Sequence, residues 1–444
     1  MKKIIILIGL FAAAIVSVFA QTLNLEQARV LALANSRSLA RYELSIRGSI
    51  LDEKNQLYSM LPSFSAGYSA SADFLQNWEF VSPVDTFNAG ASFSISHIIF
   101  QGGKSFIQKA ISAIATESVK IDALAEYYNV LDSIDNAYYA ALEAAAALEA
   151  EKSSLESANT ALSIAKIRQE SGMINRGDYL KALSDAESRE NSYNQTRRNL
   201  ALVMSKLKTL AGITGAVELE PVNFSAYESL LARLALISDE DASALYEKFM
   251  EKVKDSNPAF KRALLNSRMA EKSHTLTLRD YAPVISATIF GTGLNYSKVN
   301  GFSNYGSGGV SIRGTIPVDF WVLNNRLAKS KLALESTAHD FKNMELSMET
   351  EVQTALLSTF SQAGSVLSAR RSLEYTEKHY EFIMERYRLS QSSVSEIGDA
   401  STLYINSRNS HISSSYSFLR SLSHLRSLIA LDDESKLIEM LSGN

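Results

Sequence analysis

The 444-residue sequence contains no cysteine and only six prolines. The absence of cysteine excludes a disulfide-built secreted module and a thiolate metal site. The formal net charge of −4 excludes a dedicated nucleic-acid-binding protein, which would be basic. A hydrophobic content of 46% is too high for a disordered chain. Beyond Ala20 no run of 18 apolar residues occurs, so the rest of the sequence predicts no transmembrane helix.

The N-terminus has the pattern of an export signal. Lys2 and Lys3 precede an almost wholly apolar stretch, 4–19, and small residues lead up to Ala20. We expect residues 1–20 to be a signal peptide cleaved after Ala20, and an uncleaved membrane anchor is the alternative. Cleavage leaves 42 basic and 48 acidic residues, and no cysteine follows the site for lipid attachment. The mature chain is therefore expected in a bacterial envelope.

Glycine and proline gather in two segments, 62–103 and 283–319, which hold 11 of the 20 glycines and four of the six prolines. In both segments apolar residues alternate with Ser, Gly and Asn. This period of two predicts four strands, at 62–75, 86–100, 283–297 and 307–319. Each would have one apolar face and enough length to cross a bilayer when tilted. A half-buried soluble sheet is the alternative, although its strands usually have about 5–6 residues.

The remaining sequence favours long helices, because it is rich in Ala, Leu, Ser, Glu and Lys. Residues 104–170 contain neither proline nor glycine and would form a rod about 100 Å long. Leucines at 148, 155 and 162 recur every seven residues, as in a coiled coil. The predicted helices are 27–58, 104–170 and 178–211 in the first half, and about 242–280, 326–390 and 399–430 in the second.

The order helix, strand, strand, long helix, turn, return helix occurs twice, which indicates an internal repeat. The predicted organisation is a signal peptide (1–20), a first repeat (21–211), a linking equatorial segment (212–241), a second repeat (242–430) and an equatorial tail (431–444).

Four amphipathic strands cannot close a membrane barrel alone, since the smallest such barrels have eight. Open sheet edges are not tolerated in lipid, so strands in a membrane would have to be pooled between chains. The predicted fold class is therefore mainly α with a membrane β-barrel portion. Three copies would form a 12-stranded barrel with four strands from each protomer, continued by a long α-helical coiled-coil barrel.

Three sequence features point to a known family. An aromatic–glycine segment, 100–104, joins the second strand to the long helix, and turns at 167–178 and 386–399 lead into acidic return helices. With the doubled plan, the chain resembles the TolC-like outer-membrane efflux proteins over essentially the whole mature sequence. The resemblance implies a homotrimer in the cell outer membrane, with a helical tunnel in the periplasm. It also implies a periplasmic adaptor protein and an inner-membrane transporter of RND or ABC type as partners.

The resemblance further assigns roles to residues at the far end of the tunnel. The turns would contact the adaptor through Gly172, Met173, Ile174, Ser392, Ser393 and Val394. Asp178, Glu396 and Asp399 would form a pore constriction, where rings of carboxylates select cations and repel one another. The alternative for each acid is stabilisation of a helix N-terminus.

The sequence also departs from the family pattern. Ser390 replaces the usual turn glycine of the second repeat, and Ser392 stands where some members carry an arginine that braces the closed tip. The segment 319–326 lacks the Gly-Gly pair of its counterpart in the first repeat. The resting state of the pore therefore stays open at this point.

The predicted function is an outer-membrane exit duct of a tripartite efflux or type I secretion system, which conducts substrates passively. A periplasmic coiled-coil protein without a pore and a partner-independent small-solute porin are the alternatives. No enzyme activity, catalytic residue, cofactor or metal site is predicted, because none of the six histidines pairs at helical spacing and no phosphate-binding loop occurs. Outer-membrane lipid is an expected partner and nucleic acid is not. The tyrosines at 127, 128, 138 and 139 are interpreted as packing residues.

Overall fold

The computed structural model describes residues 22–74, 85–297, 301–303 and 306–442. The expected signal peptide lies outside the described residues. The chain divides into two compact units, which are described separately. The strand-containing unit comprises 42–122 and 262–344, and the helical unit comprises the remainder. Among the described residues, no helix combines the length and the hydropathy needed to span a membrane.

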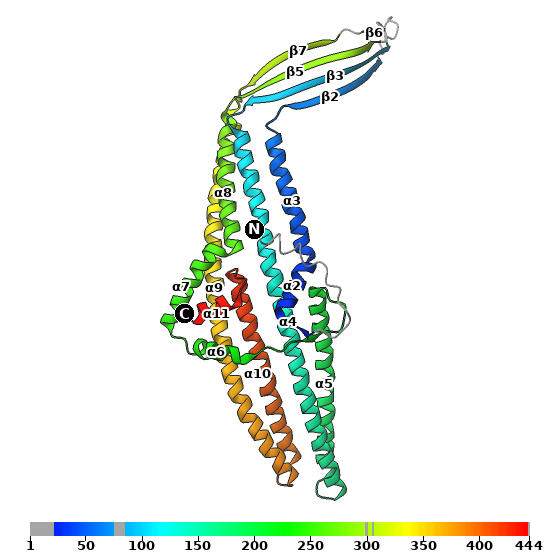
Figure 1. Ribbon diagram of the computed structural model, residues 1–444, viewed down its shortest axis with the longest axis vertical. Helices are drawn as coiled ribbons and strands as arrows, with labels where there is room; N and C mark the ends of the chain where they lie inside the picture. The colour runs from blue at the N-terminus through cyan, green and yellow to red at the C-terminus, as the bar shows by residue number, and fades with distance from the viewer. Residues whose placement is uncertain (1–21, 75–84, 298–300, 304–305, 443–444) are drawn as a thin grey trace. The chain divides into compact units, whose positions relative to one another are not determined.

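The strand-containing unit has one antiparallel sheet (Figure 1). Its long strands are β2 (Ser63–Phe74), β3 (Asp85–Phe100), β5 (Val284–Ser297) and β7 (Ser307–Thr315). They lie in the order β2-β3-β5-β7, and the short β6 (Gly301–Ser303) pairs with the end of β5. Within the described ranges, β2 and β7 each pair with one strand alone, so the sheet has two open edges. Strand β7 ends four residues before the expected 319, since Pro317 has no N–H for a ladder hydrogen bond.

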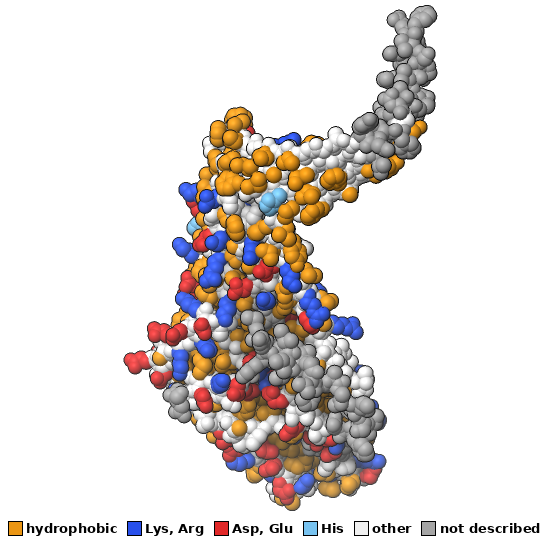
Figure 2. Space-filling model, turned by 45° about the horizontal axis from the view of Figure 1, so that its top comes forward, with side chains coloured by type: hydrophobic (Ala, Val, Ile, Leu, Met, Phe, Trp, Pro, Cys, Tyr) orange, Lys and Arg blue, Asp and Glu red, His pale blue; other side chains and the backbone are white. Residues whose placement is uncertain are grey.

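The register gives the sheet one apolar and one polar face. One row across the four strands is Phe64, Ile95, Ile289 and Val310, and the next row is Ser63, Ser96, Thr288 and Ser311. Hydroxyl pairs link neighbouring strands on the polar face, with Ser65–Ser94 at 2.7 Å and Thr292–Ser307 at 2.7 Å. Figure 2 shows hydrophobic side chains along the sheet. Phe290 is an exception on the polar face, where its ring lies over Gly309.

Two glycines of this unit allow close approaches. A Cβ on Gly291 would lie 2.3 Å from the ring of Phe93, its partner across β3 and β5. Gly102, in the turn that leaves β3, has a φ of +66°, and a Cβ there would lie 2.4 Å from that of Ala282. At the same junction Lys104 forms an ion pair with Asp280 at 2.7 Å. The Gly-Gly segment therefore fits a tight connection between strand and helix.

The helices joined to the sheet are α3 (Arg37–Tyr58), α8 (Pro258–Leu278) and the first parts of α4 (Lys104–Glu170) and α9 (Phe320–Arg388). A 3₁₀ turn, η2 (Arg279–Tyr281), follows α8. Helix α9 starts six residues before the expected 326, because the carbonyl of Asp319 accepts hydrogen bonds from the backbone of Val322 and Leu323. Before α9, this turn at Asp319 takes the place that the Gly-Gly connection occupies before α4.

The helical unit contains the ends of α4 and α9 and their return helices, α5 (Arg176–Ala211) and α10 (Val394–Leu428). Both return helices begin before the expected 178 and 399. The expected 27–58 helix is divided into α2 (Leu25–Asn35) and α3, and the 242–280 helix into α7 (Asp239–Ser256) and α8. The equatorial elements are β1 (Thr22–Leu23) paired with β4 (Glu218–Leu219), η1 (Phe224–Tyr227), α6 (Glu228–Ala235) and α11 (Glu434–Ser442).

The buried seam of α4 repeats every seven residues with mostly small side chains. Ala137, Ala144, Glu151, Ala158 and Ala165 are all buried. The leucines at 148, 155 and 162, from which the heptad was predicted, are only half-buried. Small residues at the seam let neighbouring helix backbones approach closely, so the period is that of a coiled coil while the leucines flank its centre.

A buried charge cluster joins three helices of this unit. The Asp135 carboxylate on α4 is fully buried and accepts two hydrogen bonds from Arg29 of α2, at 2.7 and 2.9 Å. Arg426 of α10 donates a third at 2.7 Å, and Ser423 donates a fourth. Burial alone would lower the pKa of Arg29, but the bonds to Asp135 raise it above its ordinary value. The cluster therefore holds its charges by mutual pairing.

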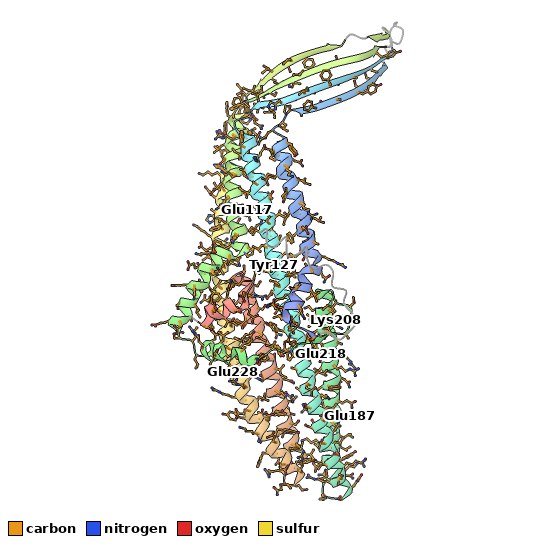
Figure 3. The ribbon with its side chains drawn as sticks, in the orientation of Figure 1. Glu117, Tyr127, Glu187, Lys208, Glu218 and Glu228 are labelled. Atoms are coloured by element: carbon orange, nitrogen blue, oxygen red, sulfur yellow. The ribbon has the colours of Figure 1, made fainter. Side chains whose placement is uncertain are left out.

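The two repeats share an asparagine contact at the end of each return helix. Asn35 Nδ2 donates to the carbonyl of Ala211 at 3.0 Å, and Asn257 Nδ2 donates to that of Leu428 at 2.8 Å. Each asparagine lies where the short helices are divided. The end of α5, near Lys208 in Figure 3, closes with Gly212 at a φ of +70°. Short helices thus meet the return helices end to end in both repeats.

Candidate functional site: the helical tips

The two tip turns have the same backbone path. After α4, Gly172 has a φ of +71° and the Met173 N–H bonds to the Arg168 carbonyl at 2.8 Å. After α9, Ser390 has a φ of 61° and the Gln391 N–H bonds to the Arg386 carbonyl at 2.7 Å. Both are helix ends with one left-handed residue, which usually is glycine. Serine therefore adopts the conformation of the missing turn glycine.

The return helices begin with side-chain caps that involve two of the predicted acids. Asn175 accepts a hydrogen bond from the Asp178 N–H at 2.9 Å. Ser393 and Glu396 form a reciprocal capping box, with both bonds at 3.2 Å. The Glu396 carboxylate therefore stabilises the N-terminus of α10, which is the alternative role considered for each of these acids.

The six residues predicted to contact an adaptor differ in exposure. Gly172, Met173 and Ser393 are exposed, Ile174 and Ser392 are half-buried, and Val394 is buried. Val394 is part of an apolar cluster that joins the ends of α4, α5, α9 and α10. Its other buried members are Ala165, Ala182, Ile383, Met384, Tyr387, Ile397 and Ala400. Residues at the surface of the turns are thus supported by a core directly behind them.

Arg168 joins the two hairpins inside the tip. Its buried guanidinium, from α4, donates a hydrogen bond to the carbonyl of Tyr387 in α9 and lies 4.4 Å from the centre of that tyrosine ring. The Tyr387 hydroxyl donates to the carbonyl of Ala161 at 3.3 Å, and burial raises the pKa of Tyr387. Sequence reasoning missed this contact, because nothing in the local pattern relates residues 219 positions apart.

A cavity of about 160 Å³ lies between the four helices at the tip. Lys181 and Asp185 of α5, Tyr380 of α9 and Asp399 and Thr402 of α10 are among its lining residues. Two polar contacts bridge α5 and α10 beside it, Lys181–Ser395 at 2.7 Å and Arg189–Thr402 at 2.8 Å.

The three predicted constriction residues occupy different surroundings. Asp399 lines the cavity, Asp178 is half-buried in the first turn of α5, and Glu396 is exposed in its capping box. Within the described part of a single chain, no hydrogen bond joins one of these acids to another. A ring built from them would need more than one copy of the chain.

The four tyrosines of α4 are in packed positions. Tyr127, labelled in Figure 3, makes an edge contact with Tyr128 at a centroid distance of 5.2 Å. Tyr138 donates to the carbonyls of Leu23 and Glu220 at 3.0 and 2.9 Å, and burial raises its pKa to about 12. Tyr139 is buried as well. These contacts tie the equatorial β1–β4 pair to α4.

Comparison with known proteins connects this arrangement to a family. Residues 28–213 match the family of outer membrane efflux proteins. A search of curated proteins finds no match. The chain is similar to the solved structure of CusC, with 15% identity and a TM-score of 0.77 over 95% of each chain. It is also similar to the CmeC outer membrane channel of Campylobacter jejuni, with 17% identity and a TM-score of 0.74 over 94% of this chain and 89% of that one. The MtrE outer membrane channel of Neisseria gonorrhoeae, solved in an open state, has 14% identity and a TM-score of 0.69 over 94% of each chain.

The structural similarity establishes the fold as that of an outer membrane channel. The family match covers residues 28–213, which is less than half of the chain. The family match and the shared fold both point to outer membrane efflux channels. The predicted fold class, mainly helical with four antiparallel strands, is therefore confirmed. The predicted channel function and outer-membrane location agree with the family match over residues 28–213.

Proposed function

We propose that three copies of the chain pool their strands into one 12-stranded barrel and form a duct that conducts substrates passively. The observation that carries this proposal is a sheet with one apolar face and two open edges. Because the strands alternate in direction, β7 of one copy and β2 of the next would pair antiparallel. That closure would satisfy the edge N–H and C=O groups in lipid, which a single chain leaves unpaired.

Cysteine crosslinking tests the closure, since the native chain has no cysteine. Ser65→Cys on β2 is combined in turn with a cysteine at each polar-face position of β7, including Ser307 and Ser311. We expect dimer and trimer bands on oxidation for at least one pair. Ser65→Cys with Thr288→Cys, on the same face of the central β5, is the matched control and should stay monomeric. A monomeric mass in detergent with no edge crosslink would contradict the proposal.

The proposed partners are a periplasmic adaptor and an inner-membrane transporter of RND or ABC type, which would supply the energy. Exposed Met173 and Ser393 at the tips support an end-on contact with an adaptor. A photo-crosslinking amino acid at Met173 should capture the adaptor in cells. The same residue at Leu202, which is exposed on α5 away from the tip, should not capture it. Equal capture at both positions would argue against a specific tip contact.

We further propose that Asp178 and Asp399, with Glu396 in a lesser role, line the constriction of the trimer. Asp178→Asn and Asp399→Asn should raise single-channel conductance and reduce cation selectivity, because each variant removes a ring of negative charges. Glu396→Gln should change conductance less, since its carboxylate caps α10. Unaltered conductance and selectivity in both variants would show that Asp178 and Asp399 do not line the constriction. A large conductance in the native channel would instead favour a partner-independent porin.

A further inference from the structure

Exposed aromatic side chains continue from the strands onto the adjoining helices. Phe106 is in the first turn of α4 and is 74% exposed, while Phe320 and Trp321 open α9, with Trp321 71% exposed. Ile316 and Val318, between β7 and α9, are also exposed. These positions lie beyond the strand ends, so the pairing of the sheet does not account for them.

Basic residues follow these aromatics along the same two helices. The first twelve residues of α4 (104–115) and of α9 (320–331) contain five basic side chains and no acidic ones. They are Lys104, Lys109, Arg326, Lys329 and Lys331. Lys104 pairs with Asp280, and the other four are exposed, with Lys331 also 3.9 Å from Glu335 of the same helix. The excess is local, because the whole chain has 44 basic and 48 acidic residues. The last twelve residues of α3 (47–58) carry two of each sign.

Helix stability does not explain this charge pattern. The N-terminal end of a helix dipole favours acidic side chains, and its effect falls off within the first turn, before Lys109 and Arg326 are reached. Figure 2 shows hydrophobic side chains over the sheet and at the adjoining helix ends, with Lys and Arg on the helices next to them. The pattern therefore indicates an external anionic partner.

We propose that this junction collar binds anionic phospholipid headgroups of the membrane leaflet that faces the helices. The junction collar comprises the aromatics Phe106, Phe320 and Trp321 and the basic Lys109, Arg326, Lys329 and Lys331. The inference rests on the proposed membrane barrel, whose apolar sheet face the collar continues. An apolar face followed by aromatics and then cations matches the order of hydrocarbon, interface and headgroup across a leaflet.

The spacing along α9 agrees with the thickness of a headgroup layer. Arg326 and Lys329 lie about 8 and 12 Å along the helix from Trp321. A headgroup layer is about 5–8 Å thick on each side of a bilayer, and long basic side chains reach several ångströms along the helix surface. With Trp321 at the hydrocarbon boundary, the charged groups of Arg326 and Lys329 therefore fall at the level of the lipid phosphates.

Trp321 provides a direct test, because the chain has only two tryptophans. Trp78→Phe leaves Trp321 as the single emitter in the full-length protein, reconstituted in vesicles that contain phosphatidylglycerol. We expect loss of emission with lipids brominated near the headgroup end of their acyl chains, and little loss with aqueous iodide. Quenching by iodide alone would overturn the proposal. Protection from both quenchers would also overturn it and would assign the collar to a contact with another copy.

Charge neutralisation tests the headgroup preference. Arg326→Gln, Lys329→Gln and Lys331→Gln together should reduce retention of phosphatidylglycerol over phosphatidylcholine by up to about fivefold for each residue at low salt. The matched control is Arg37→Gln, Lys120→Gln and Lys342→Gln, which removes the same charge from positions roughly 24–33 Å from the helix ends at the sheet. Equal lipid retention in both triple variants would overturn the proposal.

The two proposals fail in different ways. A protein that does not float with vesicles and forms no conducting channel would contradict the membrane barrel itself. A conducting channel in which Trp321 is open to iodide would contradict the junction collar alone.

Discussion

Ser390 and Ala430 adopt left-handed φ angles of 61° and 52° at the ends of α9 and α10. The equivalent positions after α4 and α5 are Gly172 and Gly212, with φ of 71° and 70°. All four ends close with a hydrogen bond from the following residue to a carbonyl five positions back. A residue with a Cβ in this conformation costs about 1–2 kcal/mol, so the second repeat carries strain that the first avoids.

Ser390→Gly is expected to stabilise its turn by about 1 kcal/mol, because it removes the Cβ from the left-handed position. Gly172→Ala is expected to destabilise the equivalent turn by a similar amount. Hydrogen exchange of the Gln391 and Met173 amides measures both effects, as slower and faster exchange respectively. Slower exchange in Gly172→Ala, or faster exchange in Ser390→Gly, would contradict the strain argument.

Asp135→Asn is expected to lower the free energy of unfolding by about 3–5 kcal/mol, because it leaves Arg426 buried without a carboxylate and Arg29 with only Glu26 and Glu434 as acidic partners. Thermal unfolding of the detergent-solubilised protein provides the measurement. Glu374→Gln, which removes a fully exposed ion pair with Lys378, is the control and should leave the midpoint unchanged. A midpoint for Asp135→Asn equal to that of the control would show that the cluster is not a stabilising element.

The sequence supports only part of these residue-scale findings. Comparison with the family pattern identified Ser390 as a departure from the usual turn glycine, but it did not predict that Ser390 keeps the left-handed backbone. The Asp135 cluster joins residues that are 106 and 291 positions apart, so no local pattern could reveal it.

At the scale of elements, Asn35 and Asn257 show how each repeat joins its helices. Asn257 is the more deeply buried contact, and its side chain also accepts hydrogen bonds from Ala259 and Phe260 at 2.8 and 3.1 Å. It therefore caps the start of α8 while it satisfies the end of α10. Asn35 bonds to carbonyls alone, those of Leu31 and Ala211.

Asn257→Ala is expected to destabilise the protein by about 2 kcal/mol, since it removes both a helix N-cap and a buried bond to a carbonyl. Asn35→Ala, which removes no N-cap bond, should cost about 1 kcal/mol. Urea unfolding monitored by circular dichroism compares the two. A larger loss for Asn35→Ala would show that the cap at Asn257 is not the main contribution.

Composition predicts the long elements well and their interruptions poorly. The stretch without proline or glycine at 104–170 is one helix, since nothing in it opposes helical backbone. The break at Ser36 carries no glycine or proline, and it coincides with the contact of Asn35 with the end of α5. The buried seam of α4 consists mostly of alanines. The heptad of leucines, from which the coiled coil was predicted, lies beside that seam and not in its centre.

At the scale of the whole molecule, period-two alternation in two segments and long uninterrupted helices were sufficient to predict the fold class. The constriction of Asp178, Glu396 and Asp399 stays a prediction for a physical reason. Asp178, Glu396 and Asp399 have separate surroundings in one chain, and a shared site depends on assembly between copies. The role of Arg168 could not be predicted from the sequence, because its contact joins two hairpins, α4–α5 and α9–α10, that are far apart along the chain.

Arg168→Ala is expected to raise the resting conductance of the assembled channel, because it frees the Tyr387 carbonyl and removes one of the contacts between the two hairpins. The loss of a buried charged hydrogen bond should also weaken the tip by about 1–3 kcal/mol.

Arg168→Lys keeps the charge but not the planar guanidinium on the tyrosine ring, so its conductance should be intermediate. Tyr387→Phe keeps that ring and loses only the 3.3 Å bond to Ala161, so its conductance should match the native channel. Single-channel recording at one salt concentration compares all four proteins. Native conductance in Arg168→Ala would show that the contact packs the tip without holding it closed.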